Sequence, residues 1–102
     1  MKIKTGVSLN GVRPEVVLAL IVVDPILQSY GQELVITSCM DGRHKRASAH
    51  YTGRAVDLRI WDLTNNKQAV DAMQEALGID YDVILESNHI HLEYDPKQGA
   101  NL

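Results

Sequence analysis

All four histidines of this chain of 102 residues lie in two short segments, at positions 44–50 and 89–91. The first segment is followed by Asp57, within the stretch HKRASAHYTGRAVDLR over residues 44–59. Zinc in proteins binds imidazole nitrogen and carboxylate oxygen in a tetrahedron, and a catalytic site keeps the fourth position open for water. Two of these histidines and Asp57 would supply the three protein ligands of such a site.

The strands expected around these residues would place them on polar faces. Residues 54–60 alternate between two faces, and Asp57 falls on the face that the apolar side chains do not use. Residues 89–94 alternate in the same way, so both histidines of this segment share a face with Glu93. We therefore expect two strands that each offer zinc-type ligands from the face turned away from the core.

A long apolar segment earlier in the chain predicts a buried helix over residues 12–30. Pro14 suits the first turn of that helix because its missing N–H group costs nothing there. Gly31 is expected to end the helix. Pro25 removes the hydrogen bond to the carbonyl of Ile21, so we expect a kink or a break at this point.

The remaining elements complete an α+β arrangement. Residues 34–38 are rich in β-branched side chains and predict a short strand. A second helix, capped by Thr64 or Asn65, should run to about residue 77, and residues 82–86 and 89–94 predict a hairpin. The apolar face of that helix is expected to comprise Ala69, Val70, Met73, Ala76 and Leu77. This order predicts helices packed on one face of a small, mostly antiparallel sheet.

Composition limits the class of protein. The length and the hydrophobic content of 45% fit one domain over residues 1–102. A net charge of -3 gives no basic footprint for nucleic acid or an anionic membrane. The longest apolar run, at 16–23, is too short for a membrane span, and the first ten residues lack a signal peptide's apolar core. We expect a cytoplasmic protein as synthesised.

Two motifs resemble those of a known family. The stretch SAHYTGRAVD, at 48–57, is similar to the Ser-x-His-x-x-Gly-x-Ala-x-Asp signature of zinc D-alanyl-D-alanine peptidases and related murein endopeptidases. The stretch ESNHIHLE, at 86–93, resembles the closing motif of the same family. Residues 41–57 are also close to part of the hedgehog signalling domain, which shares that fold. The resemblance implies the hedgehog/DD-peptidase fold, with Gly53 permitting the turn before Asp57.

The resemblance implies a set of zinc ligands. His50 and Asp57 match the first two ligands of the family. His91 is the expected third ligand, because in family members with a His-x-His pair the second histidine binds the metal. His89 remains the alternative: Glu86 stands three residues before it, and many family members have that spacing between the glutamate and the ligand histidine.

The resemblance also implies catalytic residues. Glu86 would act as the general base that takes a proton from the attacking water. His89 and His44 would flank the zinc and polarise the scissile carbonyl or stabilise its oxyanion. These three residues complete the expected catalytic set.

Substrate contacts are expected from polar residues near the first motif. Arg43, or alternatively Arg59, would hold a substrate carboxylate by a two-pronged hydrogen bond. Ser48 would hydrogen-bond the substrate or cap the turn before His50. We expect Trp61 to pack at the end of its strand, or to stack on a sugar at the rim of a cleft.

The sequence therefore predicts a zinc metallopeptidase that hydrolyses amide bonds next to D-amino acids in peptidoglycan stem peptides. Such a small chain would suit a phage or bacterial lysis enzyme that reaches the cell wall on release. Two alternatives remain: a hedgehog-like zinc-containing binding module, and a structural phage protein without hydrolytic activity. The general base distinguishes them, because only the peptidase needs it.

Overall fold

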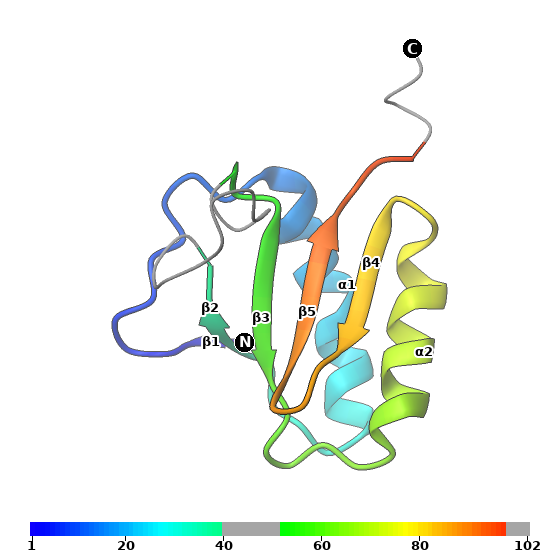
Figure 1. Cartoon of the computed structure of the whole chain (residues 1–102). Helices are drawn as coiled ribbons and strands as arrows, with labels where there is room; N and C mark the ends of the chain where they lie inside the picture. Colours follow the sequence, from blue (N-terminus) through cyan, green and yellow to red (C-terminus); the bar gives the residue numbers. More distant parts are fainter. Residues whose placement is uncertain (40–51, 98–102) are drawn as a thin grey trace.

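A computed structural model describes residues 1–39 and 52–97 of the chain. The elements of these residues, shown in Figure 1, are β1 (Lys2–Ile3), α1 (Pro14–Ser29), β2 (Val35–Ser38), β3 (Ala55–Arg59), α2 (Asn66–Leu77), β4 (Tyr81–Leu85) and β5 (His89–Tyr94). Every predicted helix and strand is present within a few residues of its expected bounds. β1 was not predicted, because two residues are too few for a periodic pattern.

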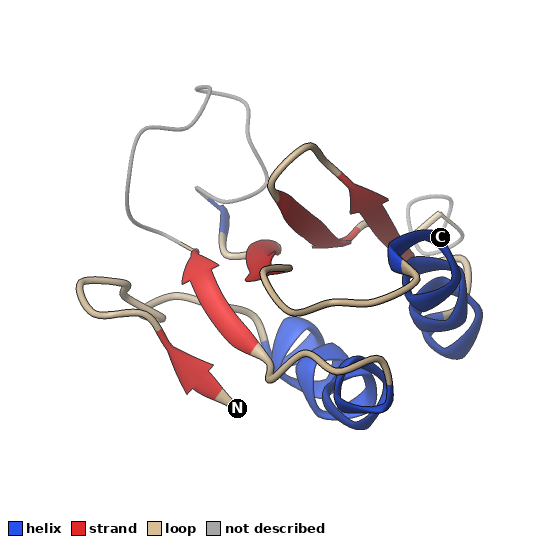
Figure 2. Cartoon of the chain, turned by 90° about the horizontal axis from the view of Figure 1, so that it is seen from below, coloured by secondary structure: helices blue, strands red, loops and turns tan. Residues whose placement is uncertain are grey.

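The five strands of the described residues form one mixed sheet in the order β1-β2-β3-β5-β4. β1 pairs with β2 in parallel, and every other neighbouring pair is antiparallel. Both helices lie on the same face of this sheet, as Figure 2 shows from below. The prediction of an α+β domain with helices on one face of a mostly antiparallel sheet is therefore confirmed.

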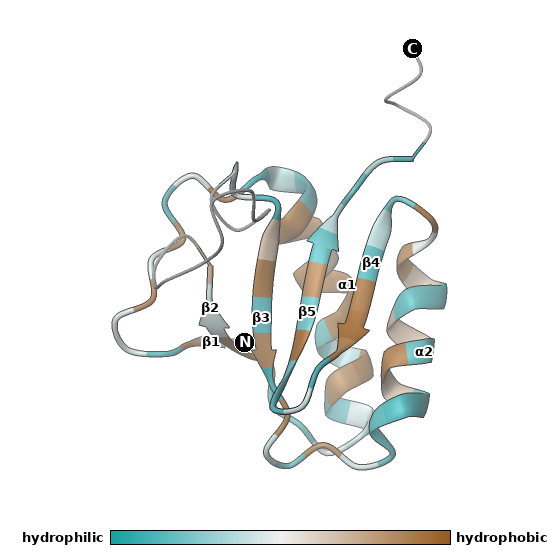
Figure 3. Ribbon diagram, viewed as in Figure 1, coloured by the Kyte–Doolittle hydropathy of each residue, from teal (hydrophilic) through white to brown (hydrophobic). Residues whose placement is uncertain are grey.

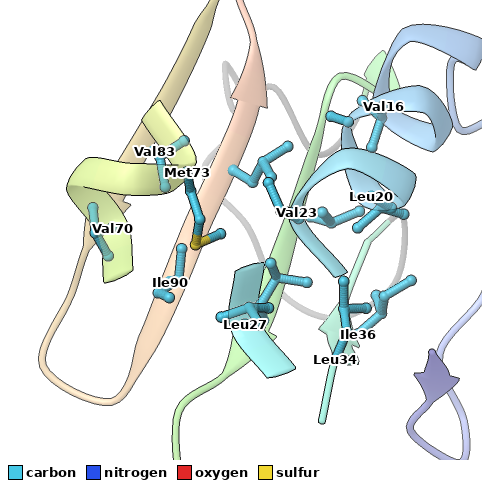
Figure 4. Packing of buried hydrophobic residues seen from close by; sticks show 14 of the residues in the cluster. Val16, Leu20, Val23, Leu27, Leu34, Ile36, Val70, Met73, Val83 and Ile90 are labelled. Atoms are coloured by element: carbon cyan, nitrogen blue, oxygen red, sulfur yellow. The ribbon is translucent and has the colours of Figure 1, made fainter. Parts of the chain in front are cut away.

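The core lies between the sheet and the two helices (Figure 4). Alternate residues of the two central strands are fully buried there: Val56, Leu58, Ile90 and Leu92. The helices supply Val16, Leu20, Val23, Leu27, Val70 and Met73. Figure 3 shows the consequence along β3 and β5, where hydrophobic and hydrophilic residues alternate. The opposite face of these strands is left for polar side chains.

The first helix differs from the prediction in two respects. It continues through Pro25 without a break, and Val23 and Leu27 on either side of the proline are both fully buried. Packing of these residues holds the two halves of the helix on the same core. The helix is also not buried on most sides, since Leu18 and Ile21 are each 60% exposed. One layer of helices covers the sheet, and none of the described elements covers the outer side of α1.

The second helix begins after Asn65 and ends at Gly78, close to the prediction. The expected side-chain cap is absent at Asn65, which has a left-handed backbone and makes no capping hydrogen bond with its side chain. Ala76, expected on the buried face, is exposed. None of the helices in the described part of the chain is long and apolar enough to cross a lipid bilayer.

Two features of the structure favour glycine at position 53, in the turn before β3. Its φ of +74° lies in the left-handed region, as the turn predicted. The turn also lies directly against the residues before α1, and the Arg13 N–H group donates a hydrogen bond to the Gly53 carbonyl at 2.9 Å. A Cβ atom on Gly53 would overlap the carbonyl oxygen of Gly11. This contact fixes where the chain enters β3.

We therefore expect Gly53→Ala to lower the free energy of unfolding by more than a left-handed backbone alone explains, which is about 1–2 kcal/mol. Gly6→Ala is the control, because Gly6 also has a positive φ, of +90°, but a Cβ atom added there would meet no heavy atom within 4 Å. Urea unfolding of both variants measures the difference. Equal losses in the two variants would show that the Gly11 contact is unimportant.

Candidate functional site

Asp57 and His91 face each other across the two central strands. They are direct partners in the antiparallel register of β3 and β5, on the face turned away from the core. The Nδ1 atom of His91 lies 3.3 Å from Oδ1 of Asp57. His89, two residues earlier on the same strand, places its Nε2 atom 3.6 Å from the same oxygen. Both histidines of the second motif therefore converge on one oxygen of Asp57.

His91 also has a carboxylate on its other side. Its Nε2 atom lies 3.0 Å from Oε1 of Glu93, and its side chain is only 18% exposed. The hydrogen bond with Asp57 is the main cause that raises the pKa of His91 to about 9; burial opposes this rise and Glu93 supports it. Sequence reasoning placed Glu93 on this face but gave it no role, although its spacing of two from His91 was the available signal.

Each histidine separately lies at a distance from Asp57 that a pair of zinc ligands needs, although Asp57, His89 and His91 are not a group of described residues whose ligand atoms all lie within 4.8 Å of one another. Ligand atoms at about 2.0–2.2 Å from a tetrahedral zinc lie roughly 3.3–3.6 Å from each other. The separation between Asp57 and His91 is 3.3 Å, and that between Asp57 and His89 is 3.6 Å. Metal-binding histidines usually donate their other ring N–H group to a carboxylate or carbonyl oxygen. Glu93 could accept this hydrogen bond from His91, whereas the Nδ1 atom of His89 lies 2.6 Å from the Asn88 amide oxygen.

Glu86 lies one position beyond β4, at the turn into β5. Its backbone N–H group donates to the His89 carbonyl at 2.9 Å, so the strand register puts its side chain on the same face as His89. The side chain is exposed. Among the described residues, no hydrogen bond or ion pair joins its carboxylate to Asp57 or His91. The expected base therefore lies beside His89 on the polar face, and it is not among the residues that line the cleft.

Four predicted site residues lie outside the described residues: His50, His44, Arg43 and Ser48. They stay predictions. The described part of the chain brings together Asp57, His89 and His91, with Glu86 beside His89.

A cleft of about 260 Å³ begins beside Asp57 and extends along the open face of the sheet. Its lining residues are Lys4, Thr37, Asp57, Arg59, Trp61, Asn88 and His89. The guanidinium of Arg59 stacks on the indole of Trp61, 3.6 Å from the ring centroid. Trp61 is 75% exposed, so the prediction that it packs at the strand end is wrong. It lies at the rim of the cleft.

A second group of carboxylates lies nearby, formed by Asp82, Glu93 and Asp95. Lys97 pairs with two of its three members, since Nζ lies 2.9 Å from Asp82 Oδ1 and 3.4 Å from Asp95 Oδ2. The hydrogen bond with Asp82 is the main cause that raises the pKa of Lys97. This group contains no imidazole nitrogen, so it differs from the ligand set that the sequence predicts for zinc.

Comparison with protein-family models, with curated proteins and with solved structures gives no match for this chain. The functional argument therefore depends on the residues and their geometry.

The pKa of His91 leads to a prediction for the metal-free protein. A pKa raised from 6.5 to about 9 in the folded state stabilises the fold fully below pH 6.5, and this contribution is lost as the pH rises through 9. Asp57→Asn removes the main cause, so the His91 midpoint should fall towards 6.5. NMR titration of the imidazole in the presence of a chelator measures both midpoints.

Asp71→Asn, an exposed change on α2, is the control and should leave the His91 midpoint in place. A midpoint near 6.5 in the unmodified protein would contradict the proposed pairing with Asp57.

Proposed function

We propose that the protein is a zinc-dependent peptidase that hydrolyses amide bonds next to D-amino acids in peptidoglycan stem peptides. The main supporting observation is the convergence of two imidazoles on Asp57, at the end of an open cleft. A structural aspartate would need neither the second histidine nor the cleft. The two motifs that resemble zinc D-alanyl-D-alanine peptidases supply the substrate class. A lysis enzyme acting on the cell wall is the setting that this activity suits.

The proposed ligands are His50, Asp57 and His91. Asp57 and His91 already lie at the separation that two zinc ligands need. Zinc bound there would lower the pKa of water towards ~7 and polarise the scissile carbonyl. Glu93 would hold the ring of His91 through its second nitrogen, which fixes the orientation of that ligand.

Proton transfer is assigned to Glu86, His89 and His44. Glu86 is exposed on the polar face next to His89, and its proposed role is to accept a proton from the attacking water. His89 lies between Glu86 and Asp57 by strand register, with its Nε2 atom turned towards the site. It is placed to donate to the oxyanion that forms at the carbonyl. His44 is the second proposed donor.

One observation favours the alternative of a hedgehog-like binding module. Glu86 has no partner that holds it over Asp57 among the described residues. A recognition site needs the metal but not a positioned base. The role of Glu86 therefore separates the two functions.

The first test of the proposal is metal content. Protein prepared without chelator should contain one zinc per chain, measured by elemental analysis. His91→Ala should lose the metal, whereas His89→Ala should keep it and lose activity. The reverse outcome would make His89 the ligand. Absence of zinc, with no gain in thermal stability on adding it, would remove the basis of the proposed function.

The second test concerns the base. Glu86→Gln keeps the size of the side chain but cannot accept a proton, so hydrolysis of purified peptidoglycan should fall by at least ~10²-fold. Zinc content and thermal stability should stay unchanged, because Glu86 is exposed and is not a ligand. Glu75→Gln, an exposed change on α2, is the matched control. Released fragments are measured by mass analysis.

An active protein whose Glu86→Gln variant kept nearly full rate would assign the base to another group. A zinc-loaded protein that cuts no stem peptide would favour the binding module.

A further inference from the structure

The outer side of α1 carries a continuous stripe of exposed apolar side chains. Its members recur at the three- and four-residue spacing of one helix face: Pro14, Val17, Leu18, Ile21, Val22 and Pro25. Leu18 and Ile21, at the centre of the stripe, are each 60% exposed. The stripe lies opposite the side of the helix that packs on the core, and none of its residues is charged.

The second helix shows that the outer surface of this layer is not apolar throughout. α2 lies on the same face of the sheet as α1 (Figure 2), and its exposed residues include Lys67, Gln68, Asp71 and Glu75. Lys67 and Asp71 form an ion pair at 3.3 Å on this surface. Large contiguous apolar patches are rare on monomeric proteins and commonly mark a surface that another molecule covers. The stripe on α1 therefore indicates a contact surface.

The stripe presents the same order of side chains from either end. Its midpoint lies between Ala19 and Leu20, and the two prolines, the two valines, and Leu18 with Ile21 are each equidistant from this point. A two-fold interface uses one patch on both copies, so that residue i meets residue j and residue j meets residue i. Antiparallel packing of two α1 helices about this midpoint would place Leu18 of one copy at the level of Ile21 of the other.

Charges beside the stripe suit the same arrangement. Arg13 and Asp24 are eleven positions apart, which is close to three helical turns, so they lie on the same flank of α1. A two-fold rotation that sets the helices side by side and antiparallel keeps this flank on one side of the pair. The guanidinium-bearing residue of one copy would then lie about 3 Å along the helix axis from the level of the aspartate of the other.

Both of these charged residues can accept a partner from a second copy. Arg13 is exposed, and no ion pair joins it to a carboxylate within residues 1–39 and 52–97. Asp24 has the terminal amine of Met1 as a distant counter-charge, at 3.8 Å from Oδ2. Opposite charges would therefore meet twice at the rim of the interface, once on each side of the two-fold axis.

The size of the stripe suits the centre of a dimer interface. A standard interface takes about 800 Å² from each partner, and the stripe supplies roughly half of that area. Interfaces between identical chains are most apolar at their centre and polar at their rim. Arg13, Asp24 and Gln28 border the stripe and would supply part of this polar rim.

We propose that two copies of this chain associate through α1, with the helices antiparallel and the two-fold axis beside Ala19 and Leu20. Asp57 and the cleft lie on the face of the sheet turned away from the helices, so both candidate sites would stay open in the dimer. The inference concerns a separate surface and does not depend on the proposed peptidase function.

Sedimentation equilibrium of the full chain tests the association. The unmodified protein should form a dimer with a dissociation constant below ~1 mM. Leu18→Lys and Ile21→Lys should each raise this constant at least ~10-fold, because each change puts a charge into the centre of the interface twice. Ile79→Lys is the matched control: Ile79 is 62% exposed, lies between α2 and β4, and should leave the constant unchanged. Circular dichroism checks that the variants keep their helices.

Charge reversal tests the antiparallel arrangement. Arg13→Glu should weaken the dimer several-fold, because it places two carboxylates together on each side of the axis. Adding Asp24→Arg to the same chain should restore the association, since the opposite charges then meet again with their positions exchanged.

A chain that stays monomeric at every concentration, or a dimer that both lysine variants leave intact, would overturn the inference. A dimer that depends on Leu18 but not on Arg13 would overturn the antiparallel arrangement. A monomer that binds phosphatidylcholine vesicles, and loses this binding in Leu18→Lys, would overturn the second copy as occupant and assign the stripe to a lipid surface.

Discussion

The hydrogen bond between Asp57 and His91 depends on the register of the two central strands, and the site depends on that hydrogen bond. Direct pairing of these residues follows from the register that also pairs Leu58 with Ile90, whose side chains are fully buried on the other face. A slip by one residue would turn either strand over and bury its polar groups. Burial of the apolar side chains therefore fixes the position of the polar ones. The same strand register therefore determines both the packing of the core and the geometry of the candidate site.

The ends of this arrangement are fixed by contacts with α1. The turn at Gly53 lies against the residues before α1, which sets the start of β3. On the other side, the hydroxyl of Tyr81 in β4 donates to the Glu15 carbonyl at 2.8 Å. The first turn of α1 and the residues just before it thus contact both the turn that leads into β3 and the hairpin with His91. Mutations in this region should therefore alter the geometry of the site, although none of these groups belongs to it.

Sequence patterns were sufficient to predict an element where alternation with a period of two, or an apolar helix face, extends over enough residues to be recognised. They gave the polar face of β3, that of β5 and the hairpin. They failed where the burial of a side chain depends on the neighbours of its element. The exposed side of α1 is as apolar as the buried side, and only the presence of a single helical layer determines which side is covered. The two-residue β1, and with it the position of Lys4, depends on pairing with β2. Asp57 and His91 could be predicted as neighbours, and the spacing of two places Glu93 beside His91. Whether Glu93 bonds to the ring, and whether Arg59 stacks on Trp61, depends on side-chain conformations that no sequence pattern encodes.

The hydrogen bonds of His91 explain why positive charge is favoured at this place. Asp57 and Glu93 both offer only oxygen acceptors, one to each ring nitrogen. A neutral imidazole has one N–H group and could satisfy only one of them. The second hydrogen bond requires an added proton, which is the physical cause of the raised pKa. A metal ion between Nδ1 and Asp57 would meet the same requirement, because it binds the nitrogen lone pair and the carboxylate together. The site therefore favours positive charge at this position, which a proton supplies in the metal-free protein and which the proposed metal ion would supply in its place.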